Sequence, residues 1–72
     1  MLKKIKIQSL FPCELTLYQN GEVEMTDITG ISYEVRDKST GTYITKVQYD
    51  DIINDRMGFW SIAKRYNLVR KV

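Results

Sequence analysis

The sequence predicts an α+β fold: a five-stranded antiparallel sheet, or a small and partly open barrel, packed by a C-terminal helix. Two observations predict it. Apolar and polar residues alternate with a period of two through much of the first two-thirds of the chain, which is typical of half-buried strands. Beyond residue 50 the apolar residues recur at helical spacing instead. A chain of 72 residues is expected to form one small domain, residues 1–72.

The first strand is expected within the segment KKIKIQSL, residues 3–10. Its alternation places Ile5 and Ile7 on the same face of the strand. Pro12 has no backbone N–H to donate to a strand ladder, so we expect it to end this run.

The segment ELTLYQNGEVEMT, residues 14–26, predicts a hairpin whose register depends on the length of its loop. A two-residue loop would place Leu17 opposite Glu24, which mixes a core residue with an acid on one face. A three-residue loop, residues 19–21, with Gly21 in the left-handed conformation, brings all four apolar side chains onto one face. Because a slip of one residue moves every side chain to the opposite face, we expect the second register. Its apolar pairs are Leu17–Val23 and Leu15–Met25.

A second hairpin is expected in the segment GISYEVRDKSTGTYITKVQY, residues 30–49. A five-residue loop, residues 37–41, would join its two strands and complete the sheet of five. The expected pairs are Val35–Tyr43, Tyr33–Thr45 and Ile31–Val47.

Helical spacing begins near Asp50. Either Asp50 or Asp51 is expected to cap the helix N-terminus, because a carboxylate accepts hydrogen bonds from the free backbone N–H groups there. Gly58 either ends a short helix in the left-handed conformation or lies within one longer helix. The sequence favours two short helical segments joined at Gly58.

Within the segment GFWSIAKRYNL, residues 58–68, an apolar stripe predicts a helix that faces the core. Trp60 lies beside this stripe and is the best single candidate for an anchor that binds a partner. Lys64, one helical turn further on, could make a cation–π contact with it. The alternative is that Trp60 packs on Ile53 and Met57. The residues of the stripe are Phe59, Ile62, Ala63 and Tyr66.

The ten residues FWSIAKRYNL resemble the first helix of the LysM glycan-binding motif, and they also resemble the first helix of a helix-turn-helix. The first resemblance implies a role in glycan binding and the second a role in DNA binding. Only VRKV follows Leu68, whereas a LysM unit needs a further helix and strand and a helix-turn-helix needs a recognition helix. Neither family is assigned.

The net charge of +2 is unevenly distributed. Residues 1–12 carry a charge of +3, residues 61–72 carry +4 and the intervening segment carries −5. A nucleic acid could bind along the basic C-terminus, or the basic ends could fold back and neutralise the acidic middle. The candidate phosphate-binding residues are Lys64, Arg65, Arg70 and Lys71, to which Lys4 and Lys6 could add.

The outward face of the first hairpin carries acids. Glu14, Glu22 and Glu24 lie close together there, and Glu22 and Glu24 are candidates for docking on a basic protein surface. Complementary charge of this kind speeds association and selects the partner. The alternative is a solvated sheet face.

Several classes of function are disfavoured. The chain has no histidine and no glycine-rich phosphate loop, so we expect no catalytic residues, no metal site and no cofactor. Its single cysteine, Cys13, allows no internal disulfide and is expected to be an inert buried thiol. No signal peptide or membrane span is recognisable, which predicts a soluble, cytoplasmic protein.

The sequence therefore predicts a small non-enzymatic module that binds and regulates a larger protein, with nucleic-acid binding as the alternative. A content high in Ile, Lys, Tyr and Asp and low in Ala is consistent with a phage or an AT-rich bacterial genome, so an inhibitor or accessory protein of a phage or mobile element would fit. Pairing of exposed sheet edges could also give a homodimer.

Overall fold

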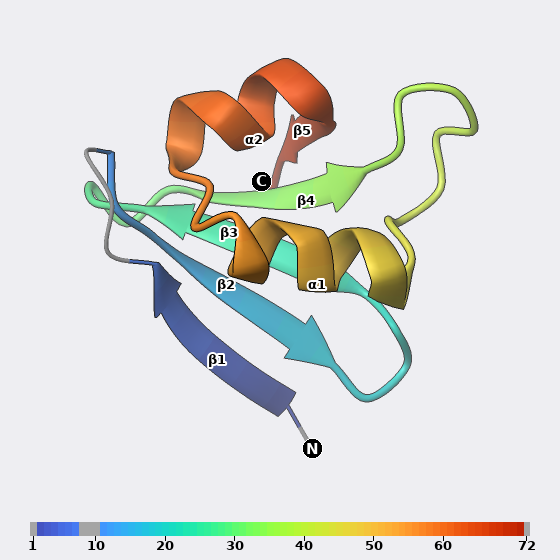
Figure 1. Cartoon of the computed structure of the whole chain (residues 1–72), viewed down its shortest axis with the longest axis horizontal. Helices are drawn as coiled ribbons and strands as arrows, with labels where there is room; N and C mark the ends of the chain where they lie inside the picture. The colour runs from blue at the N-terminus through green and yellow to red at the C-terminus, as the bar shows by residue number, and fades with distance from the viewer. Residues whose placement is uncertain (1, 8–10, 72) are drawn as a thin grey trace.

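The computed structural model describes residues 2–7 and 11–71, and it has an α+β fold (Figure 1). A five-stranded antiparallel open sheet in the order β1-β2-β3-β4-β5 carries two helices on one of its faces. The predicted fold class is confirmed. The elements are β1 (Leu2–Ile7), β2 (Cys13–Tyr18), β3 (Val23–Asp27), β4 (Ser32–Arg36), α1 (Lys46–Asn54), α2 (Phe59–Arg65) and β5 (Asn67–Arg70).

β2 and β3 form the hairpin that the sequence predicts. The first predicted strand overlaps β1, and its residues 8–10 lie outside the described part of the chain. Leu17 pairs with Val23 in the hairpin of β2 and β3, and Leu15 pairs with Met25. The loop between these strands has three residues, and Gly21 adopts a φ of 91° in it. The apolar period of each strand therefore decided its register, because only this register buries the apolar side chains of both strands together.

The predicted strand over residues 42–48 is wrong. Only an isolated bridge between Arg36 and Tyr43 extends β4, in place of the expected Val35–Tyr43 pair, and the chain then leaves the sheet. Thr45 is the N-cap of α1: its side chain accepts a hydrogen bond from the backbone N–H of Gln48, and the Gln48 side chain accepts one from the Thr45 N–H. This reciprocal capping box stabilises a helix start five residues before the expected one.

Asp50 and Asp51 accordingly lie inside α1 and do not cap it. Two short helices are present, as expected, but Gly58 does not end the first one. The left-handed residue is Arg56, with a φ of 49°, whereas Gly58 is extended and serves as the N-cap of α2. The N–H of Met57 donates to the Ile52 carbonyl at 3.1 Å, which closes the first helix in a Schellman motif.

The fifth strand comes from the C-terminal tail. β5 pairs antiparallel with β4, with Leu68 opposite Val35 and Arg70 opposite Tyr33. The tail thus returns to the sheet after two helices, and the basic segments at the two ends of the chain lie at opposite sheet edges.

Both helices lie on the same face of the sheet, where they enclose the core (Figure 1). Side chains with no exposed surface come from strands and helices alike: Leu15, Met25, Val35, Ile52 and Ile62. The predicted helical stripe is confirmed, since Ile62 and Tyr66 are buried while Phe59 and Ala63 are half-buried. Neither of the two described helices lies over the opposite face, which we call the open face of the sheet.

Candidate functional site

Three large apolar side chains stand exposed at one end of the molecule. Trp60 is 61% exposed, Phe11 48% and Ile28 76%. They come from α2, from the segment before β2 and from the turn between β3 and β4, and they border one hollow of about 220 Å³. We call this set the aromatic surface. The lining of the hollow consists of Phe11, Pro12, Asp27, Ile28, Thr29, Phe59 and Trp60.

Backbone and ring contacts hold the two exposed aromatic rings in place. The N–H of Phe59 donates to the Phe11 carbonyl at 2.9 Å, which ties the start of α2 to the segment before β2. The Trp60 ring stands edge-on to Phe59 at 4.9 Å and to Phe11 at 6.4 Å between centroids. Such edge-to-face pairs are favourable beyond the area that they bury. Both rings are therefore positioned by contacts within the chain itself.

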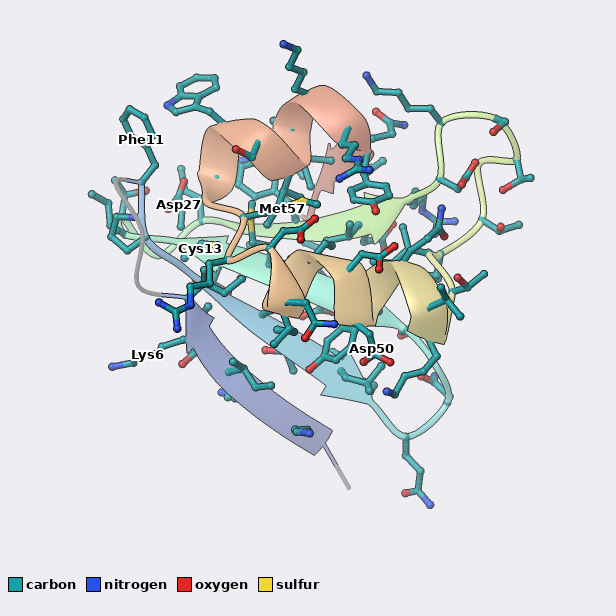
Figure 2. All side chains as sticks on the ribbon, in the orientation of Figure 1. Lys6, Phe11, Cys13, Asp27, Asp50 and Met57 are labelled. Carbon is teal, nitrogen blue, oxygen red and sulfur yellow. The ribbon has the colours of Figure 1, made fainter. Side chains whose placement is uncertain are left out.

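Ile28 projects from a tight turn that Asp27 organises. One carboxylate oxygen of Asp27 accepts hydrogen bonds from the Thr29 hydroxyl at 2.6 Å and from the backbone N–H groups of Thr29 and Ile31 at 2.9 and 3.1 Å. The Thr29 hydroxyl chiefly, with these N–H groups, lowers the pKa of Asp27. Asp27 and Phe11 lie at the same end of the sheet (Figure 2). The turn thus presents an apolar tip beside an ionised carboxylate.

Of the aromatic surface, the sequence identified only Trp60. Trp60 lies beside the helical core stripe, as predicted, and its ring neighbours are Phe11 and Phe59. The expected cation–π contact with Lys64 is not among those of the described residues, which join Arg36 to Tyr43 and Lys46 to Tyr49. Ile28 could have been found from the sequence, because it is a large apolar residue within the turn sequence Asp-Ile-Thr-Gly.

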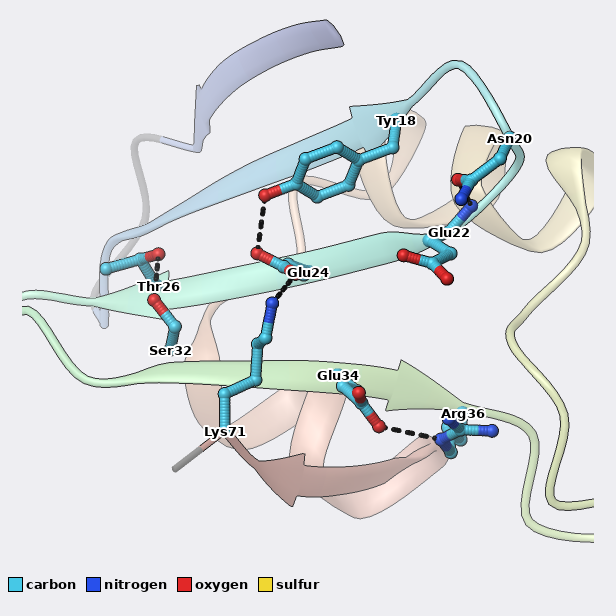
Figure 3. A network of polar contacts seen from close by, with 9 residues as sticks. All are labelled: Tyr18, Asn20, Glu22, Glu24, Thr26, Ser32, Glu34, Arg36 and Lys71. Carbon is cyan, nitrogen blue, oxygen red and sulfur yellow. Dashed lines mark hydrogen bonds and ion pairs between the residues drawn. The ribbon is translucent and has the colours of Figure 1, made fainter.

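The candidate basic residues do not form one surface. Lys64 and Arg65 belong to α2, and Arg65 lies 3.7 Å from Asp55. Arg70, in β5, lies opposite Tyr33 of β4, and its side chain is on the face of the sheet that carries the helices. Lys71 lies on the open face of the sheet and pairs with Glu24 (Figure 3). The set is therefore divided among a helix and the two faces of a strand, and two of its members are next to carboxylates.

Glu24 lies on the outward face of the first hairpin, as expected, but its carboxylate is engaged by other side chains of the chain. Glu24 is only 8% exposed, and it accepts hydrogen bonds from the Tyr18 hydroxyl at 2.8 Å and from Lys71 (Figure 3). Glu22, the other acidic candidate for docking, is half-buried and lies near Glu24 at the end of the hairpin loop. Further along this face, Arg36 donates to Glu34 at 3.0 Å. The open face is therefore a network of paired polar groups.

Cys13 is buried, as predicted, and burial raises the pKa of its thiol to about 11. Its sulfur donates to the Met57 carbonyl at 3.9 Å, so it lies between β2 and the segment that joins the helices. Within residues 2–7 and 11–71, no group of three or more Cys, Asp or Glu side chains is arranged to hold a metal ion.

No protein-family model, no curated protein and no solved structure matches this chain. None of the helices in the described part of the chain has the length and apolar character that crossing a membrane requires.

Proposed function

We propose that this chain is a small protein-binding module that acts on a larger protein as an accessory or inhibitory component. One observation carries the proposal: Trp60, Phe11 and Ile28 are exposed together around one hollow. Exposed apolar residues are ordinary when scattered singly, but a cluster that borders a hollow is typical of an interaction surface. Tryptophan is also among the residues that most often dominate the binding energy of interfaces.

The rigidity of the aromatic surface supports the same role. The hydrogen bond from the Phe59 N–H to the Phe11 carbonyl fixes α2 against the segment before β2, and the turn organised by Asp27 fixes the position of Ile28. A surface that is already ordered loses little conformational entropy on binding, so more of the contact energy appears as affinity.

The chemistry of the hollow defines the segment that it would accept. Its apolar lining and its volume of about 220 Å³ suit one large aliphatic or aromatic side chain. The Asp27 carboxylate borders the hollow, and its lowered pKa keeps it ionised at neutral pH. We therefore propose that the partner inserts an apolar side chain and places a lysine or arginine next to it.

Affinity capture from a nuclease-treated lysate of the native host, followed by mass spectrometry, would test this proposal. The wild-type chain and a Val47→Ala variant should retain the same protein, whereas Trp60→Ala and Ile28→Asp should lose it. Val47 is a matched control because it is 70% exposed but belongs to the first turn of α1, outside the aromatic surface. Trp60 is the only tryptophan, so the purified partner should also shift Trp60 fluorescence to shorter wavelength and protect it from acrylamide quenching.

Two outcomes would contradict the proposal. If Trp60→Ala retained the partner as well as Val47→Ala does, the aromatic surface would not be the binding site. If capture required nucleic acid, fell steeply with salt and failed in a Lys64→Glu, Arg65→Glu variant, the nucleic-acid alternative would hold instead.

A further inference from the structure

The free edge of β1 lies outside the aromatic surface and combines three properties. Among the strands of residues 2–7 and 11–71, β1 pairs only with β2, so alternate backbone N–H and C=O groups along its six residues face outward with no described strand beside them. α1 crosses over the middle of the sheet and leaves the outer edge of β1 open (Figure 1). An open hollow of about 350 Å³ lies beside this edge, lined by Ile5, Lys6, Ile7, Ile53 and Arg56.

The charges around this edge are positive. Lys3, Lys4, Lys6 and Arg56 are exposed, and the ion pairs of the described residues involve none of them. Lys6 faces Glu14 across the strand pair, whereas Lys3 and Lys4 face the uncharged Leu17 and Thr16. At least three cations therefore remain available to a ligand.

We propose that the β1 edge binds an extended acidic segment of a partner protein by strand addition. An added strand would satisfy the outward backbone groups of β1, and its side chains would alternate between the two faces of the sheet. Apolar side chains of the segment would enter the hollow against Ile5 and Ile53. Carboxylates would lie on the other face, beside Lys4 and Lys6, and the Arg56 guanidinium at the hollow would add to the positive field that attracts them.

The lysines argue against a second copy of this chain as the occupant. Antiparallel pairing of β1 with itself would bring lysine against lysine, and like charges directly opposite are destabilising. Edge lysines also discourage pairing with uncharged strands. The edge therefore selects for an acidic strand.

The test is binding of a labelled nonapeptide in which glutamate alternates with valine, followed by fluorescence anisotropy and by amide chemical shifts of the full chain. Binding should weaken at least tenfold between low and high salt, and the shifted amides should be those of β1. A peptide of the same composition with its glutamates in one block should bind at least tenfold more weakly, because it lacks the alternation.

Variants distinguish the β1 edge from the rest of the molecule. Arg56→Gly relieves a left-handed residue, so it should fold at least as well as the wild type, yet it should bind the peptide several-fold more weakly. Arg70→Gln removes an exposed cation at the opposite edge and should have no effect. A Lys4→Glu, Lys6→Glu variant should reject the acidic peptide and accept one in which lysine alternates with valine.

Amide shifts at β5 in place of β1, or equal weakening by Arg70→Gln and Arg56→Gly, would overturn the proposal. So would failure of the acidic peptide to bind at millimolar concentration. Competition by a single-stranded oligonucleotide at equal strength would assign the edge to nucleic acid instead. The Trp60→Ala variant should bind the peptide normally, so this site and the aromatic surface can fail independently.

Discussion

Tyr18, at the end of β2, and Lys71, directly after β5, bind the same carboxylate, that of Glu24 in β3. The hydrogen bond to Glu24 is the main reason that the pKa of Tyr18 and the pKa of Lys71 are both raised. Each group therefore holds its proton more tightly in the folded chain than in the unfolded chain. Its contribution to stability is complete below its unfolded pKa and is lost as pH rises through its folded pKa.

The first prediction concerns this pH dependence. Glu24→Gln removes the charge that both partners share, so it should lower the urea midpoint at neutral pH. The advantage of the wild type should stay constant to about pH 9 and shrink above about pH 10, where unfolded tyrosine and lysine titrate. Urea unfolding between pH 7 and pH 11 would measure it. Glu14→Gln is the control, and an identical profile for both variants would disprove the role of Glu24.

The second prediction concerns the Cys13 thiol. With a pKa of about 11, only about a thousandth of it is thiolate at pH 8, and burial further limits access. Its reaction with a disulfide reagent at pH 8 should therefore be at least a hundredfold slower in the native chain than in urea. Rapid reaction of the native chain would mean that the segment around Met57 opens readily from β2.

The third prediction concerns the end of α1. Arg56 occupies the left-handed position of a Schellman motif, where a residue with a Cβ atom is strained and glycine is not. Arg56→Gly should raise the free energy of unfolding by about 0.5–1 kcal/mol, the relief of strain less the greater flexibility of unfolded glycine. Arg56→Ala keeps the Cβ atom and should change stability little. Greater stability of the alanine variant would contradict the assignment.

Sequence patterns sufficed for the fold wherever one face of a strand had to be buried. The alternation of Leu15, Leu17, Val23 and Met25 permitted only one register in the first hairpin. The fifth strand could not be found in this way, because residues 42–48 alternate as a strand does while β5 is short and mostly exposed. β5 is a strand because β4 offers it an edge, and that contact is not local in the sequence.

A local signal for the start of α1 was nevertheless present. Thr45 and Gln48 form the spacing of a capping box, and Ile44 and Tyr49, both buried, flank it as a hydrophobic staple does. The fourth prediction follows: Thr45→Ala should lower the free energy of unfolding by about 1 kcal/mol. Urea denaturation would measure it. Thr42→Ala, an exposed threonine before the helix, is the control, and equal effects would rule out the cap.

The candidate site was less predictable than the fold, for a physical reason. Trp60 could be found because a helix has a fixed period and an aromatic residue off the core stripe must face outward. Phe11 and Ile28 come from a segment before a strand and from a turn, which have no period. Their proximity to Trp60 depends on how α2 packs on the sheet, which involves the backbone hydrogen bond between Phe59 and Phe11.

The last prediction distinguishes a residue of α2 that stabilises the fold from one whose side chain is free to bind a partner. Ile62 has no exposed surface, so Ile62→Val, which removes one methylene, should cost about 1 kcal/mol of unfolding free energy. Trp60 is 61% exposed and contacts mainly the rings of Phe11 and Phe59, so loss of its whole indole in Trp60→Ala should cost no more than that. Thermal and urea unfolding of the two variants would compare these costs. A loss of several kcal/mol in Trp60→Ala would mean that the indole stabilises the fold, and its exposure would then give no support to a binding role. Equal costs would mean that the largest side chain of the helix contributes little to stability, as expected of an anchor for a partner.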